Sequence, residues 1–155
     1  MNKTTIAFVG CSKTKRKPDG SGYLAARDLY AGQLFAKRVE HVERRGLPWY
    51  ILSAKSGLLK PSVSVRPYDA TIGGMSEIEV AEWNLGVANQ LMSELWFEFG
   101  NPALKSVVVE LHAGAKYCEP LGSILSMFGV TVVKPVEKLG IGKQLAFYDS
   151  SVRAT

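Results

Sequence analysis

Four short basic segments, each directly after an apolar run, carry residue types that bind anions. They are residues 10–15, 53–59, 112–117 and 134–144 (GCSKTK, SAKSGLL, HAGAKY and KPVEKLGIGKQ). Small residues let a ligand approach the backbone closely, and lysines supply positive charge for phosphate. A solvated run of charges is the plain alternative for any one segment. Four such segments together favour an anion-binding site assembled from several parts of the chain.

Three other side chains have the chemistry of acids and bases. Asp69 ends the segment RPYD, where Pro67 and Tyr68 favour a rigid loop over a flexible linker. Glu110 is a charge inside the apolar run VVVEL, and a buried carboxylate is costly unless it is paired. It can lie at a sheet edge, pair with a lysine or take part in chemistry. His112 follows that run, and we expect it to face the same site.

The familiar nucleotide and metal motifs are absent from the sequence. The spacing of a P-loop does not occur, and Gly140 and Gly142 lack the third glycine of a dinucleotide fingerprint. Cys11 and Cys118 form no Cys-x-x-Cys pair, which excludes a thioredoxin-like motif and a zinc motif of that kind. We therefore expect neither a metal ion nor a cofactor.

Apolar runs that alternate with helical patterns supply the elements that would position these residues. The predicted strands are residues 5–9, 49–53, 106–111 and 130–133, and the predicted helices are residues 33–45, 76–97 and 115–128. Residues 142–148 are predicted to form a short final helix or a turn. Arg38 stands at the apolar spacing of the helix over 33–45, whereas His41 lies among charges and is expected at the surface. Residues 54–74 are predicted to be one long connection, a length that is typical of functional loops.

The helix over 76–97 has the clearest start signal in the chain. Ser76 and Glu79 have the spacing of a capping box. From the apolar spacing that follows, Ile78 and Leu85 are predicted to face inward.

The order of these elements predicts an α/β fold. Strands separated by amphipathic helices favour a three-layer α/β/α architecture with a central, mostly parallel four-stranded sheet. We expect residues 5–9 and 49–53 to be neighbouring strands. Ligands of such sheets bind beyond the carboxyl ends of the strands, at a topological switch point. The fold therefore predicts one cleft that gathers the following residues: Cys11, Ser12, Lys13, Lys55, Asp69 and His112.

Composition is consistent with one globular domain over residues 1–155. Hydrophobic residues make up 46% of the chain, the formal net charge is +5 and the sequence pI is about 9.2. This basic excess permits a nucleic-acid partner without requiring one. The opening MNKTTIAFVG is too short an apolar run for a signal peptide or a membrane span. We expect a monomeric cytoplasmic protein with no membrane partner.

Several motifs together resemble a small bacterial and phage domain family of uncharacterised function. They are CSKTK, RDLY, ILSAKSGLL, RPYD, the Ala-Gly-x-x-Tyr-x-x-Pro-Leu of residues 113–121, and LGIGKQ. The portion from SAKSGLL to PYD is similar to YaaA peroxide-stress proteins, and CSK is similar to the CSxKK element of archaeosine synthases. These families are related to the uracil-DNA glycosylase-like fold, and the resemblance covers nearly the whole chain. The uracil-excising motifs GQDPYH, GINP and HPSP are missing, so uracil is not the expected base.

The resemblance implies a DNA glycosylase, because some members of this group resemble phage-defence enzymes that excise glucosylated hydroxymethylcytosine. Cleavage of an N-glycosidic bond needs a carboxylate near the sugar and donors near the departing base. The expected catalytic residues are Asp69 first and Glu110 second, with His112 beside them. The expected base-binding residues are Cys11, Ser12, Lys13, Ser53, Lys55, Tyr68 and Tyr117. The expected phosphate-binding residues are Lys15, Arg16, Lys17, Lys116, Lys143 and Gln144. The expected partner is duplex DNA with one modified base flipped out of the stack.

Two other classes of function stay open from the sequence. One is a base-modifying or nucleotide-processing enzyme that acts on a small molecule or RNA, as the likeness to archaeosine synthases permits. The other is a DNA-binding stress protein without catalysis, as the likeness to YaaA permits.

Overall fold

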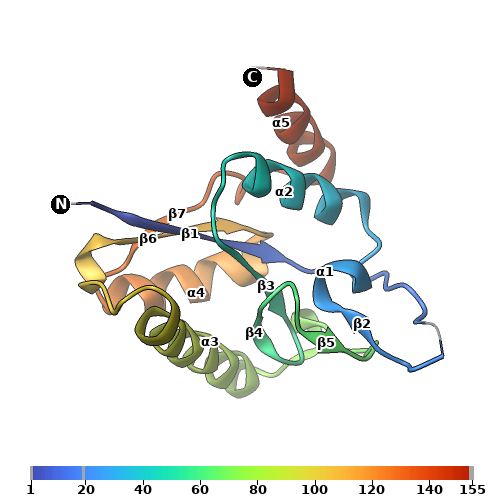
Figure 1. The fold of residues 1–155 in the computed structure, drawn as a ribbon, viewed down its shortest axis with the longest axis horizontal. Coiled ribbons are helices and arrows are strands. Elements are labelled where there is room, and N and C mark those ends of the chain that lie inside the picture. Colours follow the sequence, from blue (N-terminus) through green and yellow to red (C-terminus); the bar gives the residue numbers. More distant parts are fainter. Residues whose placement is uncertain (1, 19, 154–155) are drawn as a thin grey trace.

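A mixed five-stranded sheet forms the centre of the molecule (Figure 1). The structure is a computed structural model that describes residues 2–18 and 20–153. The strand order is β4-β3-β1-β6-β7, and every neighbouring pair is parallel except β3 with β4. The strands are β1 (Thr4–Gly10), β3 (Trp49–Ser53), β4 (Gly57–Leu59), β6 (Val107–His112) and β7 (Thr131–Val133).

The prediction of a four-stranded sheet is wrong, because the sheet has one further strand. The four predicted strands correspond to β1, β3, β6 and β7, and β1 pairs with β3 as expected. The fifth strand, β4, lies inside the segment that was predicted to be one long connection. It folds back on β3 after a short turn, and Gly57 takes a φ of 71° that favours glycine. Gln90 holds this turn, because its side-chain oxygen accepts from the Leu58 N–H at 2.8 Å.

Helices cover both faces of the sheet, which confirms the α/β class and the predicted layers (Figure 1). One face carries α2 (Gln33–Arg44) and α5 (Ile141–Arg153), and the other carries α3 (Glu77–Glu98) and α4 (Ala115–Met127). Smaller elements complete the fold: β2 (Leu24–Ala25), α1 (Ala26–Leu29), β5 (Ser64–Val65), η1 (Ile72–Gly74) and η2 (Leu104–Ser106). Strands β2 and β5 form a separate two-stranded antiparallel sheet.

Side chains of β1 alternate between two hydrophobic clusters. Ile6 and Phe8 join the cluster beneath α3 and α4, whereas Ala7 and Val9 join the cluster on the face that α2 covers. A strand that is buried on both faces reads as an unbroken apolar run, as this one does.

The predicted capping box of α3 is confirmed, and Ala88, Leu91 and Leu95 face inward, whereas the predicted burial of Ile78 and Leu85 is wrong. Ser76 Oγ accepts from the Glu79 N–H at 3.2 Å, and Glu79 Oε2 accepts from the Ser76 N–H at 2.7 Å. Ile78 and Leu85 are exposed. Trp83 is buried instead and donates from its indole nitrogen to the Ser53 carbonyl at 2.9 Å. This buried tryptophan fixes the rotation of the helix about its axis.

Strand β1 is the switch point of the sheet. The chain passes from β1 to β3 on one side, and the later strand β6 joins β1 on the other side. The segments after β1 and β6 therefore diverge and leave a crevice between them. Within the described residues, no helix is both long and apolar enough to cross a membrane.

Candidate functional site

Two adjoining cavities lie beyond the carboxyl ends of β1 and β6, and together we call them the strand-end crevice. Their volumes are about 230 and 360 Å³. Both are lined by Cys11, Ile72, Lys116 and Tyr117. Ser12, Lys13, Ala70, Thr71 and Gly73 line the first, and Gly10, Leu34, Arg38, Gly114, Ala115, Ile141 and Gln144 line the second. The crevice thus joins residues about a hundred positions apart, as predicted for the ends of parallel strands.

The basic loop after β1 is anchored rather than free. The Arg16 N–H donates to the Leu29 carbonyl at 2.7 Å, and the Ala31 N–H donates to the Thr14 carbonyl at 3.0 Å. Ser12 Oγ accepts from the Gly32 N–H at 3.3 Å. A Cβ at position 32 would lie 2.8 Å from the Ser12 Cβ, so glycine permits this close approach. The loop therefore presents its cations from a fixed position.

Tyrosine hydroxyls lie close to this basic loop: Tyr30 and Tyr68 are beside Lys15, and Tyr117 lines the crevice itself. The hydroxyls of Tyr30 and Tyr68 are 2.7 Å apart, and Ser53 Oγ donates to Tyr68 at 2.9 Å. The Tyr117 hydroxyl lies 3.5 Å from Cys11 Sγ. Burial is the main cause that raises the pKa of all three tyrosines. At neutral pH these hydroxyls are therefore protonated, and each has one proton to donate.

Lys15 and Lys55 approach the Tyr68 ring. Lys15 Nζ lies 4.5 Å from the ring centroid, and Lys55 Nζ lies 6.0 Å from it. Lys15 Nζ also donates to the Lys13 carbonyl at 3.1 Å. Lys55 lines a separate cavity of about 250 Å³ with Tyr23, Ser56, Ser64, Val65, Arg66 and Tyr68, and not the crevice itself. Lys55 therefore departs from the predicted single cleft, and Lys15 is held against the tyrosines by cation–π contact.

Asp69 lies at the rim of the crevice. It lines a hollow of about 410 Å³ that shares Ala70 and Thr71 with the first cavity. Its side chain is exposed, and within residues 2–18 and 20–153 it has no hydrogen-bond or ion-pair partner. Asp69 therefore does not serve as a turn-forming hydrogen-bond acceptor, which is the common role of aspartate in loops.

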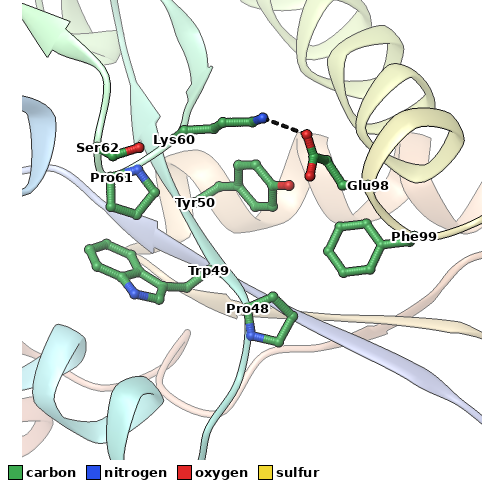
Figure 2. A pocket seen from close by; sticks show the side chains of 8 residues that line it. All are labelled: Pro48, Trp49, Tyr50, Lys60, Pro61, Ser62, Glu98 and Phe99. Atoms are coloured by element: carbon green, nitrogen blue, oxygen red, sulfur yellow. Dashed lines mark hydrogen bonds and ion pairs between the residues drawn. The ribbon is translucent and has the colours of Figure 1, made fainter.

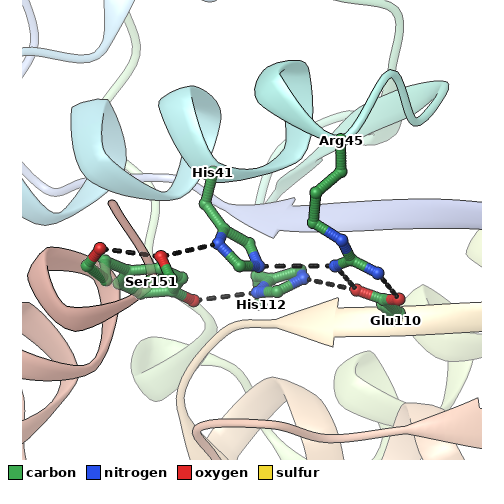
Figure 3. Close-up of polar contacts among 6 residues, drawn as sticks. His41, Arg45, Glu110, His112 and Ser151 are labelled. Atoms are coloured by element: carbon green, nitrogen blue, oxygen red, sulfur yellow. Dashed lines mark hydrogen bonds and ion pairs between the residues drawn. The ribbon is translucent and has the colours of Figure 1, made fainter. Parts of the chain in front are cut away.

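Glu110 and His112 lie away from the crevice, in a buried network beneath α2 and α5 (Figure 3). Arg45 donates to the two Glu110 oxygens at 2.6 and 2.8 Å. His112 Nε2 lies 3.0 Å from Glu110 Oε1, and its Nδ1 lies 2.9 Å from the Tyr148 hydroxyl. The bonds from His112 and Arg45 lower the pKa of Glu110 to about 2. The expectation that His112 faces the crevice is wrong, because its ring is fully buried.

The same network settles two of the alternatives for Glu110. Strand β6 lies between β1 and β7, so Glu110 is not at a sheet edge. Its cationic partner is Arg45 and not a lysine. His41 was expected at the surface, but it is half-buried, with its ring centroid 5.2 Å from that of His112 and its Nδ1 3.1 Å from Ser151 Oγ. These contacts tie β6 to the two helices that cover it.

The remaining predicted residues have different surroundings. Lys116 and Gln144 line the crevice, whereas Lys143, Arg16 and Lys17 are exposed and line neither of its cavities. Ser53 is fully buried, where it positions Tyr68.

Sequence reasoning missed Arg38 as a site residue. Arg38 is only 6% exposed and lines the second cavity of the crevice. Its Nη2 donates to Gln144 Oε1 at 2.8 Å, and its Nη1 donates to the Gly10 carbonyl at 3.3 Å. Burial lowers the pKa of Arg38. The available signal was a charged residue at an apolar position of an amphipathic helix.

A further pocket lies at the amino end of β3, whereas the crevice lies at the carboxyl ends of the strands (Figure 2). This pocket has a volume of about 330 Å³ and is lined by Pro48, Trp49, Tyr50, Lys60, Pro61, Ser62, Glu98 and Phe99. Its one lysine is paired, because Lys60 Nζ lies 2.8 Å from Glu98 and 3.6 Å from Glu94. Among the described residues, no three His, Cys, Asp or Glu side chains gather closely enough to hold a metal ion.

Comparison with known proteins identifies a family, but the function of that family is unknown. The model of a family of unknown function (DUF6884) matches residues 6–150. No curated protein and no solved structure matches the chain.

Proposed function

The chain belongs to this DUF6884 family of unknown function, and from its own geometry we propose that it is a DNA glycosylase that excises a modified base. The base that the motif resemblance favours is a hypermodified cytosine such as glucosylated hydroxymethylcytosine, and the uracil-DNA glycosylase-like fold belongs to the same proposal.

One observation carries the proposal, namely the unpartnered carboxylate of Asp69 at the rim of a cationic crevice. Lys13 and Lys116 line the neighbouring cavity, and none of the acidic residues described here lines either cavity of the crevice. A free carboxylate near an excess of cations suits a reaction in which a sugar becomes positive beside a polyanion.

The reaction assigns a role to each group. The bond between C1′ of the sugar and the base nitrogen breaks, and its electron pair leaves with the base. Asp69 offsets the positive charge that develops on the sugar and orients a water molecule, whose oxygen bonds to C1′. The water proton passes to Asp69, and the departing base gains a proton from a donor such as Lys13 or the Tyr117 hydroxyl. The products are an abasic site and the free base.

Aromatic side chains suit the recognition of a flipped base. Tyr117 lines both cavities of the crevice and stands against Trp83, with ring centroids 5.4 Å apart. A rigid ring with a protonated hydroxyl can stack on a base or donate to its edge. Cys11 and Ser12 line the same wall.

A second candidate is a nucleotide-processing enzyme that acts on a small molecule. The modest volumes of the two cavities favour it, because a free nucleotide needs no extended surface outside them. This candidate predicts activity on mononucleotides and little dependence of activity on salt.

Excision assays with an Asp69→Asn variant test the proposal. Duplex DNA with normal cytosine or with glucosylated hydroxymethylcytosine is incubated with protein and then treated with alkali, which cleaves at abasic sites. We expect cleavage of the modified DNA by the wild-type protein and a loss of about 10²–10⁴-fold in Asp69→Asn.

The matched control for this assay is Asp28→Asn. Asp28 is exposed on α1 and lines none of the cavities described above, so its loss should leave the rate unchanged. A wild-type protein that releases no base from any modified DNA would contradict the proposed function.

A further inference from the structure

The guanidinium of Arg38 is a buried charge without a counter-charge in the described chain. The oxygens that it contacts are neutral: those of Gly10 and Gln144, and the protonated hydroxyl of Tyr148. Its Nε is buried and has no hydrogen-bond partner among the described residues. A buried cation is costly unless an anion pairs with it. In the network on β6, by contrast, the exposed Arg45 pairs with the carboxylate of Glu110.

The ionisable groups nearest to Arg38 do not provide the missing charge. They are Tyr148, Cys118 and Cys11. Burial raises the pKa of Tyr148 to about 12 and that of Cys118 to about 11, so both are neutral at pH 7. An anion from outside the chain would therefore be the counter-charge of Arg38.

The cavity beside Arg38 is open to such an anion. Arg38, Gly114, Lys116 and Gln144 all line the 360 Å³ cavity. Gly10 keeps the strand end close to Arg38, because a Cβ there would lie 3.2 Å from Arg38 Nη1 and 3.0 Å from the Ala113 Cβ. Gly114 leaves open space, since a Cβ there would meet nothing within 4 Å.

Helix α4 begins at this cavity. Its N-cap is Gly114, which offers no side-chain cap, and the helix runs over 13 residues. The N–H groups of Ala115 and Lys116 are early donors of this helix, and the amino end of a helix favours negative charge. The buried guanidinium, the helix end and the Lys116 ammonium thus bring three sources of positive potential to one cavity.

We propose that this part of the strand-end crevice, the Arg38 pocket, binds a phosphate group. Arg38 pairs with the phosphate oxygens, the first N–H groups of α4 donate to them, and Lys116 covers the open side. Gln144 acts as a positioning residue, because its oxygen accepts from Arg38 and its Nε2 donates to the Leu139 carbonyl at 2.8 Å. Arginine binds phosphate oxygens in a bidentate way, and the helix amino end and the lysine supply further donors for the remaining oxygens.

Phosphate binding is independent of catalysis in this inference. It rests on the proposed function only in assigning the phosphate to a nucleotide. That nucleotide is either part of DNA or free, and the two sources share the same phosphate chemistry. Phosphate binding is therefore measured first, with inorganic phosphate as the probe.

Calorimetric titration of the wild-type protein with inorganic phosphate, with chloride at equal ionic strength as the reference, tests the proposal. We expect saturable binding of one phosphate per chain and a melting temperature that rises with phosphate concentration. A melting temperature that responds equally to phosphate and chloride, without a binding isotherm, overturns the inference.

A Gln144→Glu variant tests the assignment to Arg38 without removing the arginine. The new carboxylate stands where Gln144 Oε1 accepts from Arg38 and supplies an internal counter-charge. We expect phosphate affinity to fall at least about tenfold, while the protein without phosphate stays folded and as stable as the wild type. A folded Gln144→Glu protein that binds phosphate as tightly as the wild type contradicts the proposal.

Two further variants complete the series. Arg38→Met removes the cation, and we expect the folded variant to lose phosphate binding; retained binding there also contradicts the proposal. Lys105→Met is the matched control, because Lys105 is an exposed lysine of η2, which precedes β6 and so lies at the amino end of that strand, away from the crevice. Phosphate affinity should be unchanged in it.

Competition distinguishes the two sources. If the phosphate belongs to DNA, an oligonucleotide duplex displaces inorganic phosphate and a nucleoside 5′-monophosphate binds no more tightly than phosphate itself. If it belongs to a free nucleotide, the monophosphate binds more tightly and the duplex does not compete. Phosphate binding without base excision would contradict the proposed glycosylase function and leave this inference intact. Base excision without phosphate binding would contradict this inference and leave the glycosylase function intact.

Discussion

The strand-end crevice and the network around Glu110 contain similar groups that are arranged in opposite ways. In the network, Glu110 accepts from Arg45 and pairs with His112, and every described member has a partner (Figure 3). In the crevice, the guanidinium of Arg38 has no anionic partner and Asp69 at the rim has no cationic partner among the residues that the structure describes. Pairing thus separates the groups that hold the fold together from the groups that are available to a ligand.

The pocket at the amino end of β3 supports this distinction. Its volume is similar to that of the Arg38 pocket, but its lysine pairs with Glu98 (Figure 2). Glu94 also lies 3.6 Å from the same ammonium. Cavity size alone would not identify the site, whereas unpaired charge does.

The salt dependence of DNA binding is the largest effect that we expect from the cations in and around the crevice, and it sharpens the comparison with the paired network around Glu110. If about five cations such as Lys15, Arg16, Lys17, Lys116 and Lys143 contact phosphates, the log–log slope of affinity against salt is roughly −4 to −5. Between 50 and 200 mM salt, duplex affinity then falls by about 10²–10³-fold. Fluorescence anisotropy with labelled duplex measures this, and a slope near zero would favour the small-molecule candidate.

Next in size is the loss of stability on breaking the network. Glu110→Gln removes the carboxylate that Arg45 and His112 share, and leaves His112 buried beside a neutral amide. We expect the free energy of unfolding to fall by about 1–3 kcal/mol. Urea denaturation followed by circular dichroism measures it, and an unchanged midpoint would show that the network is not needed for stability.

Acid unfolding should report the same network. The pKa of Glu110 is lowered in the folded protein to about 2 from an ordinary value of 4.5. The stability that it contributes is therefore fully present above about pH 4.5 and is lost as the pH falls towards 2. Glu110→Gln should lack this part of the acid dependence, and an identical pH profile of stability in the two proteins would contradict the assignment.

The smallest expected effect concerns the tyrosine hydroxyls beside the crevice. Tyr68→Phe loses the bonds of the Tyr68 hydroxyl to Tyr30 and Ser53. We expect a loss of about 1 kcal/mol in stability, because both partners are left with an unmet hydrogen bond. Thermal melting measures the change, with Tyr23→Phe on the exposed side of the Lys55 cavity as the control.

Much of the fold was predictable because its signals are local. Unbroken apolar runs identified β1 and β3, and the spacing of Ser76 and Glu79 identified the start of α3. Strand β4 was missed because a segment of three residues is too short to show the two-residue alternation of apolar and polar side chains that indicates a strand. Its pairing with β3 depends on Gln90, which is distant in sequence.

The site was predictable only as a set of strand ends. Of the six residues predicted to share one cleft, Cys11, Ser12 and Lys13 line the crevice, and Lys116 and Gln144 from the predicted phosphate-binding set join them there. The sequence could not assign His112, because the face on which a strand residue lies depends on which helix covers that face. The two-residue spacing of Glu110 and His112 could have indicated a shared face, but Arg45, their partner in the network, comes from α2 and cannot be found by spacing.

The central claim is that unpaired groups act on a ligand and paired groups do not. Release of glucosylated hydroxymethylcytosine from duplex DNA, compared between Asp69→Asn and a folded Glu110→Gln protein, tests it most directly. The account predicts that Asp69→Asn loses about 10²–10⁴-fold in rate, whereas Glu110→Gln stays within about threefold of the wild type. The opposite result, with excision kept in Asp69→Asn and lost in folded Glu110→Gln, would contradict it and move catalysis to the buried network.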